Sequence, residues 1–426
     1  MTPPSPARLS WRPFSALAGV FLLLTLPLLF ARGENPYTWD ETSFYFPAIR
    51  QIREHWPRVD LLQDSLSATA PGYQYVLAGV SFVTGVERLP LRFVNLLVSL
   101  GVLALLWRWW PADRSWRFAF LAMLPLAASN FFVKSSAYVV TDNAALLATA
   151  GTLGALLFAP AGGGLGRASV LSTAAVFIRQ SSLWLMAPLG FQLLRAGPPR
   201  WRLALVLPPL AAVLWMVVTW KGLVPPRWQA DVKASGLLVP AAGAYLLSVL
   251  GVLGSFYYLA ARPANWREDV FNRFTALGAA AGLVFAFAGT NIPDYEAGRW
   301  GGYLWEVAAR VPALGAFSPV FIVLAPAGGA MLAILGRRLW LEAGHSVALP
   351  WLAACLAWAG AGLSNRLVFH RYFEPTILLL LIAWLALVLR SRGPDARVAG
   401  LPLAILGAGQ LAITLITAHG RTFGFL

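Results

Sequence analysis

Two adjacent carboxylates, Asp40 and Glu41, follow the first apolar segment of the chain by only a few residues. Trp39 precedes them, and an aromatic ring beside a carboxylate can stack on a sugar while the carboxylate accepts a proton. The end of an apolar segment holds such residues near the headgroup plane of a bilayer. Asp40 is therefore a candidate general base, with Glu41 orienting a reaction partner or supporting the loop. The alternative for such a pair in a loop is simple solvation.

Further ionisable residues lie at the edges of apolar segments, where charges are costly and usually face a cavity or a partner. Guanidinium and imidazole groups there suit a phosphate. Arg371 could instead be an interfacial anchor whose head reaches toward water. The residues in question are Lys134, Asp142, Arg179 and the cluster Arg366, His370, Arg371 and Glu374. We expect Arg179, His370 and Arg371 to bind a phosphate, and Trp39, Gln180, Tyr372 and Asp142 to contact substrate.

Patterns for metal or nucleotide chemistry are missing from the sequence. The four histidines are far apart, Cys355 is the single cysteine, and there is no HExxH, GxSxG or Walker loop. We expect neither a metal nor a cofactor.

The elements that must position these residues are membrane-spanning helices. Hydrophobic residues make up 58% of the 426 residues and charged residues 12%, about half the charged share of a soluble domain. The net charge of +15 forms no continuous basic patch of the kind that binds nucleic acid. We expect one all-α polytopic domain over residues 1–426 with about 11–13 spans. These are placed near 14–31, 92–109, 117–131, 138–158, 168–178, 181–195, 201–220, 238–260, 274–289, 319–336, 347–363, 376–389 and 401–418.

Two short apolar segments, 168–178 and 181–195, are expected to form a hairpin that turns near Arg179, Gln180 and Ser181. The first apolar segment, 14–31, resembles a signal peptide, but the many segments after it favour a retained helix.

Residues 72–86 decide the topology. If they lie along the interface, 17 of the 33 basic residues but only five of the 18 acidic residues face the cytoplasm, giving +12 inside and +3 outside. Basic loops prefer the cytoplasm, so we expect this arrangement, with a cytoplasmic N-terminus. Segments 32–91 and 290–318 are then the two sizeable outer loops, and chemistry belongs to the outer face. Arginine far outnumbers lysine, and alanine, glycine and proline are abundant, which is typical of a GC-rich bacterial genome. We therefore expect the membrane to be a bacterial cytoplasmic membrane.

A series of short motifs between about residues 39 and 375 resembles the dolichyl-phosphate-glucose α-1,2-glucosyltransferases of N-glycan precursor assembly. That family belongs to the GT-C superfamily of membrane glycosyltransferases. The motifs are Asp40-Glu41, Pro71-Gly72, Leu91-Arg92-Phe93-Val94-Asn95-Leu96-Leu97, the stretch Tyr138 to Asn143, Arg179-Gln180 and His370-Arg371-Tyr372.

The resemblance implies a GT-C fold and a polyprenyl-phosphate sugar donor, which in a bacterium would be an undecaprenyl- or decaprenyl-phosphate sugar. It implies transfer of a hexose, glucose in that family, to a lipid-linked glycan or other acceptor. Residues 290–318 depart from the family pattern. A polytopic transporter or lipid flippase, another GT-C enzyme such as a protein O-mannosyltransferase, and a structural membrane protein are the alternatives.

Overall fold

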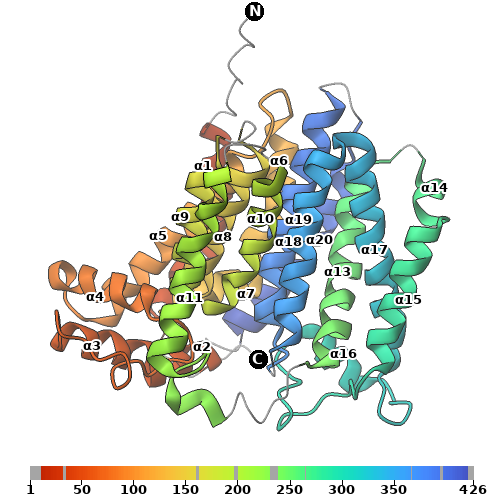
Figure 1. Cartoon of the computed structure of the whole chain (residues 1–426). Helices are drawn as coiled ribbons and strands as arrows, with labels where there is room; N and C mark the ends of the chain where they lie inside the picture. Colours follow the sequence, from red (N-terminus) through yellow and green to blue (C-terminus); the bar gives the residue numbers. More distant parts are fainter. Residues whose placement is uncertain are drawn as a thin grey trace, which may run out of the picture. The chain divides into compact units, whose positions relative to one another are not determined.

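The computed structural model of the chain describes residues 11–31, 35–159, 163–195, 200–230, 238–263, 265–365, 367–393 and 397–420. Within these ranges all regular elements are helical, apart from two isolated β-bridges (Figure 1). This agrees with the predicted all-α class.

Eight helices in the described ranges are long and apolar enough to cross a membrane. A ninth span results if α6 (Trp116–Ala127) and α7 (Asn130–Ala137), which meet at a bend of 69°, are counted together. All eight coincide with predicted spans. Their number, length and apolar character are those of a multi-pass membrane protein. They are α1 (Arg12–Leu29), α5 (Arg88–Trp107), Trp201–Trp220 formed by most of η3 (Arg200–Val206) and α11 (Leu207–Trp220), α13 (Pro240–Ala260), α17 (Pro319–Ala343), α18 (His345–Leu363), α19 (His370–Arg392) and Gly400–Gly420 formed by α20 (Gly400–Thr414) and η5 (Leu415–Gly420).

The other five predicted spans form shorter helices, so the full-length helices of the described ranges do not reach the expected 11–13. Polar residues end helices inside the predicted spans. Ser129 caps the start of a separate helix, Asn130–Ala137, and Arg179 ends the helix Leu165–Ile178 because its backbone is extended, with φ −145° and ψ 115°. The shorter helices are α6 (Trp116–Ala127), α8 (Asp142–Leu157), α9 (Leu165–Ile178), α10 (Met186–Arg195) and α15 (Arg273–Phe287).

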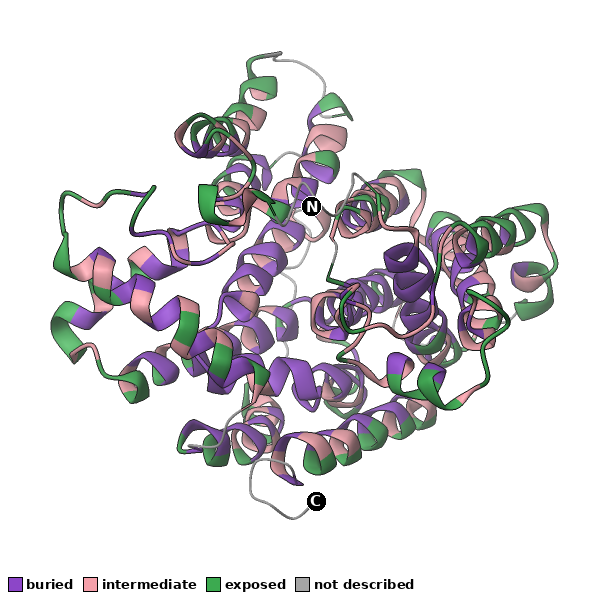
Figure 2. Cartoon of the chain, turned by 90° about the horizontal axis from the view of Figure 1, so that it is seen from below, coloured by how far each residue is buried: buried purple, intermediate pink, exposed green. Residues whose placement is uncertain are grey.

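The exposed faces of the long helices are apolar, which is the reverse of a soluble protein. Many helices carry buried and exposed residues on opposite faces (Figure 2). The exposed side chains include Leu23, Leu97, Val218, Leu277 and Val323, each more than 60% accessible. Such faces require a lipid environment.

The chain divides into two compact units, each built from three segments. We call the first the Asp40 unit (Arg12–Trp107, Ala127–Ala234 and Gly409–Leu426) and the second the His370 unit (Met1–Trp11, Arg108–Leu126 and Ser235–Ala408).

In the Asp40 unit, the predicted outer loop folds into short helices. They are α2 (Pro36–Asp40), the π-helical turn η1 (Glu41–Tyr45), α3 (Phe46–Glu54) and α4 (Gly72–Thr84). Helices α3 and α4 pack together and run across the long helices of the unit (Figure 1). With 13 residues, α4 is about 20 Å long, too short to cross a hydrocarbon layer of roughly 30 Å. The structure thus agrees that residues 72–86 are not a span.

The predicted hairpin is also present in the Asp40 unit. Leu165 and Ala168 near the start of α9 share a buried cluster with Leu189 and Leu193 of α10, so the two helices run back along each other. The reversal occurs at Arg179 and η2 (Gln180–Leu185), as the sequence predicts.

In the His370 unit, α13 and α19 are the most buried spans. Glycines let α17 approach α13 closely: a Cβ atom on Gly251 would lie 2.9 Å from the backbone nitrogen of Gly328. Close contact of this kind stabilises helix pairs in lipid, where no hydrophobic force drives them together.

The loops of the His370 unit sort to two ends. Segments predicted to face the cytoplasm, 108–117, 261–273, 337–346 and 390–400, contact one another, as do the predicted outer segments 290–318 and 364–372. Among the predicted cytoplasmic segments, Arg390 Nε donates to Trp109 O (3.1 Å), Arg337 Nη1 donates to Asp269 Oδ1 (2.7 Å), and Arg392 forms an ion pair with Glu342. Among the predicted outer segments, Val368 N donates to Gly298 O (2.9 Å) and His370 N donates to Gly301 O (3.3 Å).

Candidate functional site

One helical segment, Pro36–Glu54, carries the predicted carboxylates. Asn35 starts it, because its side chain accepts hydrogen bonds from the N–H groups of Tyr37 (2.9 Å) and Thr38 (3.1 Å). The turn Glu41–Tyr45 then widens into a π-helix. Such single turns are frequent at functional sites because they insert one residue and turn neighbouring side chains to different sides. Here the turn separates the surroundings of Asp40 and Glu41.

Glu41 is completely buried and serves as an anchor. Its carboxylate accepts hydrogen bonds from Arg92 Nε at 2.8 Å and Arg92 Nη2 at 2.5 Å, and from the Val139 N–H at 3.1 Å. Arg92 also donates to the carbonyl oxygen of Leu29 at 2.7 Å. Of the two roles expected for Glu41, this position fits support of the loop. It leaves the carboxylate no exposed side for an acceptor.

Asp40 is partly exposed and has polar neighbours. Together they form a group that we call the Asp40 cluster: Asp40, Tyr45, Asp142 and Arg179. Burial raises the pKa of the Tyr45 hydroxyl, the charge of Arg179 lowers it, and the charges of Asp142 and Asp40 raise it. These three charges therefore lie within electrostatic range of one hydroxyl. Tyr45 itself was missed by the sequence analysis, although its aromatic position four residues after Glu41 was visible.

Arg179 and Asp142 form the centre of the Asp40 cluster. Arg179 Nη1 lies 2.6 Å from Asp142 Oδ1, with side chains 21% and 12% accessible. Asp142 is the first residue of α8, where a carboxylate interacts favourably with the helix dipole. About a fifth of the Arg179 side chain stays accessible, and Asp142 fixes its orientation.

Trp39 begins an aromatic row beside Asp40. It is 60% accessible, and its ring meets Phe44 at 4.9 Å between centroids. Phe44 in turn meets Trp228 at 5.2 Å. An exposed indole next to a carboxylate presents a flat apolar face, and the substrate contact expected of Trp39 stays a prediction.

Gln180 was predicted to contact substrate, and the structure assigns it a different task. Its Nε2 donates to Ala68 O and its Oε1 accepts from Ala70 N, both at 2.8 Å, so the amide clamps the loop before α4. The same loop packs tightly on α9, because a Cβ atom on Gly72 would lie 2.5 Å from Phe177 O. These contacts explain Gly72 and Gln180 within the Pro71-Gly72 and Arg179-Gln180 motifs.

His370 was predicted to bind phosphate, but it lies in a buried network of the His370 unit. Its Nε2 is 2.6 Å from Glu374 Oε2 and its Nδ1 is 2.6 Å from the hydroxyl of Tyr245. Only 4% of the residue is accessible. With both ring nitrogens held by neighbours, His370 fixes the start of α19 and is not oriented to hold a ligand. Tyr245, within an apolar segment, had no distinguishing signal in the sequence.

Arg371 and Tyr372 are more accessible. Arg371 Nη2 donates to the Tyr372 hydroxyl at 3.0 Å, and its guanidinium lies over the rings of Phe369 and Tyr372 at 5.6 and 5.0 Å. Phe369 also contacts Trp300 from the predicted outer loop 290–318. Cation and rings together form a surface suited to a polar ligand with an anionic group. Arg366, predicted in the same cluster, lies outside the described residues.

The residues predicted to bind phosphate thus belong to both units, Arg179 to the Asp40 unit and His370 and Arg371 to the His370 unit. Lys134 reaches the carbonyl oxygen of Thr417 at 3.4 Å within the Asp40 unit. In the described part of the chain, no three His, Cys, Asp or Glu side chains are grouped so that they could hold a metal ion. Comparison with protein-family models, curated proteins and solved structures finds no match to this chain.

Proposed function

We propose that the chain is a membrane glycosyltransferase of GT-C type that transfers a hexose from a polyprenyl-phosphate donor to a lipid-linked glycan or another hydroxyl acceptor. The observation that carries this proposal is the Asp40 cluster. It combines a partly exposed carboxylate with a partly accessible arginine, and the exposed Trp39 adjoins it, on a unit with lipid-compatible helices. The motif resemblance suggests glucose as the sugar.

The proposed reaction is a direct displacement with inversion. Asp40 accepts the proton of the acceptor hydroxyl as its oxygen bonds to the anomeric carbon, and the bond from that carbon to the phosphate oxygen breaks. The leaving polyprenyl phosphate keeps the bonding electron pair, and its negative charge is stabilised by Arg179. Asp142 orients Arg179, and Trp39 stacks on a sugar ring.

We place the site at the outer face of a bacterial cytoplasmic membrane, with the N-terminus in the cytoplasm. The uneven distribution of arginine supports this orientation. The clustering of the predicted cytoplasmic loops in the His370 unit is consistent with it.

The test is incubation of purified protein with radiolabelled polyprenyl-phosphate sugars and a membrane lipid extract. Asp40→Asn keeps the shape of the side chain but removes its basicity, so turnover should fall about a hundredfold or more while donor binding is retained. Glu54→Gln is the matched control, because Glu54 is an exposed carboxylate at the end of the same helical segment.

Near-normal turnover of Asp40→Asn would exclude Asp40 as the base. No sugar transfer by the wild type, together with movement of the lipid or sugar across a vesicle membrane, would instead favour a transporter or flippase.

A further inference from the structure

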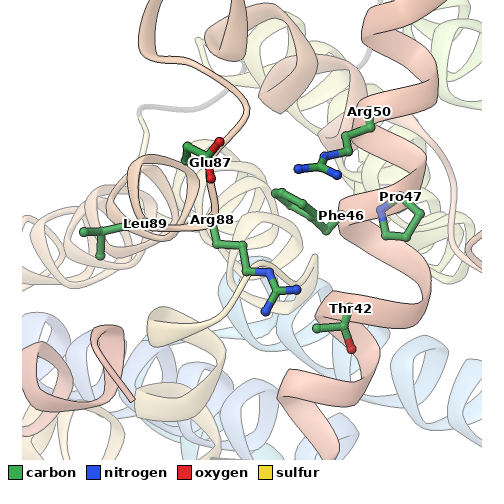
Figure 3. Close-up of a pocket in the computed structure, with 7 residues that line it drawn as sticks. All are labelled: Thr42, Phe46, Pro47, Arg50, Glu87, Arg88 and Leu89. Carbon is green, nitrogen blue, oxygen red and sulfur yellow. The ribbon is translucent and has the colours of Figure 1, made fainter. Parts of the chain in front are cut away.

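A cavity of about 560 Å³ lies between α3 and the start of α5 in the Asp40 unit (Figure 3). None of the residues discussed for the transfer reaction lines it. Its walls combine apolar side chains with two arginines, and they are formed by Thr42, Phe46, Pro47, Arg50, Glu87, Arg88 and Leu89.

The two arginines of the cavity converge on one aromatic ring. The guanidinium carbon of Arg50 is 4.6 Å and that of Arg88 5.5 Å from the centroid of Phe46. Figure 3 shows the two side chains reaching this ring from opposite sides. Phe46 therefore holds two positive charges at one place, against their mutual repulsion.

Neither Arg50 nor Arg88 forms an ion pair with a described carboxylate. Glu87 lines the same cavity, but its side chain points away from the guanidinium of Arg88 (Figure 3). The lining thus keeps a net positive charge. The cavity also includes the first turn of the 20-residue helix α5, whose N–H groups favour an anion.

An apolar stripe on α5 runs onward from the cavity. Leu89, Phe93 and Leu97 are spaced four residues apart, so they lie on one helix face. Their accessible fractions are 38%, 38% and 64%, and Phe30, 61% accessible, packs its ring on Phe93 at 6.4 Å between centroids. Because α5 is long enough to cross a membrane, this stripe borders the hydrocarbon layer.

We propose that the cavity binds the phosphate head of a membrane lipid whose apolar chain lies along the α5 stripe. Guanidinium groups bind phosphate oxygens through paired hydrogen bonds, which suits a head held between Arg50 and Arg88. The stripe favours a lipid over free phosphate as the source of that group. This inference does not depend on sugar transfer, since it involves neither Asp40 nor Arg179.

The experiment measures binding to the purified protein in a neutral glycol-ether detergent by native mass spectrometry. The probes are dodecyl phosphate, dodecanol and inorganic phosphate, which separate the contributions of head and chain. Dodecyl phosphate should bind at least about tenfold more tightly than either of the others. Arg50→Gln and Arg88→Gln should each weaken its binding about tenfold, the effect of losing charged hydrogen bonds.

Arg53→Gln is the matched control, because Arg53 lies on the same helix but over the ring of Phe82, at 5.4 Å, outside the cavity. It should bind dodecyl phosphate like the wild type. The proposal is overturned if Arg50→Gln and Arg88→Gln also bind like the wild type. It is equally overturned if inorganic phosphate binds as tightly as dodecyl phosphate, or if Arg53→Gln weakens binding as much as the two cavity variants. A thermal unfolding curve confirms that each variant is folded.

Discussion

Arg92 and Glu41 meet in two parallel hydrogen bonds, with Nε 2.8 Å from Oε1 and Nη2 2.5 Å from Oε2. Both side chains are buried, at 7% and 0% accessibility, and the remaining Nη1 of Arg92 holds the backbone at the end of α1. The ion pair thereby joins α1, the π-helical turn and α5. Its main consequence is stability of the loop that carries Asp40.

Removing one partner of this pair should destabilise the protein strongly. Glu41→Gln or Arg92→Met leaves a buried charge without its counterpart, at a cost of about 3–5 kcal/mol. We expect the midpoint of thermal unfolding to fall by several degrees in each variant, and by less than the sum in the double variant. Strictly additive shifts would show that the pair does not act as a unit.

Arg179 should be sensitive even to replacement by lysine. A lysine ammonium cannot make paired contacts with Asp142 and a phosphate at once, so Arg179→Lys should raise the KM for the donor about tenfold. Arg310→Lys is the control, because Arg310 forms an exposed pair with Glu306 at 3.3 Å, with side chains 72% and 61% accessible. An unchanged KM in Arg179→Lys would remove this residue from the donor site.

The charge distribution predicts which loops are cytoplasmic. After Cys355, the single cysteine, is replaced by alanine, new cysteines can be labelled with a membrane-impermeant maleimide in intact cells. Cysteines at Leu62 and Glu296 should react, whereas cysteines at Asp113 and Glu268 should react only after the membrane is opened. Labelling of Glu268→Cys in intact cells would contradict the proposed topology and indicate the opposite orientation.

Divalent metal should be unnecessary for transfer, since arginine can stabilise the charge of a leaving phosphate. Turnover in excess EDTA should match turnover with added magnesium or manganese. Loss in EDTA and recovery with metal would point to a carboxylate site, for which Asp40 and Asp142 are the first candidates.

The pair of His55 and Asp64 makes the stability of the predicted outer loop 32–91 depend on pH. The hydrogen bond and charge of Asp64, 2.9 Å away, raise the pKa of His55 above its ordinary value of about 6.5. A raised pKa in the folded state contributes stability that is present below pH 6.5 and is lost as the pH rises through the folded pKa. The unfolding midpoint of the wild type should therefore exceed that of His55→Gln at pH 6 by more than at pH 8.5. An equal difference at both pH values would contradict this.

Composition and apolar length predict the helical membrane class and the positions of the eight full-length helices. They also predict the reversal at Arg179, where a polar pair interrupts two short apolar segments. They do not predict where helices end inside apolar segments, because a helix end depends on local capping, as at Ser129, which apolar length alone does not reveal. In the described part of the chain, eight or nine of the 11–13 expected spans are therefore long and apolar enough to cross a membrane.

The tasks of individual polar residues were harder to predict. Gln180 and His370 look like ligand-binding residues in sequence, yet Gln180 bonds backbone atoms more than 100 residues away, and His370 bonds the distant Tyr245 as well as the nearby Glu374. Arg92 and Asn95 lie in an otherwise apolar helix, so the sequence indicates that each has a buried polar partner. Only the fold shows the partners, such as the Tyr73 hydroxyl that donates to Asn95 Oδ1 at 2.7 Å. Tertiary hydrogen bonds of this kind leave no periodic pattern.

The π-helical turn Glu41–Tyr45 holds one residue more than an α-helical turn would need. Deleting Ser43 would therefore convert Pro36–Glu54 into a continuous α-helix and keep the directions of the side chains at its two ends. A deletion within the α-helical part that follows, between Phe46 and Arg50, would instead rotate every later side chain by about 100°. The turn is thus the place where this segment can gain or lose a residue while Glu41 and Arg50 keep their relative orientation.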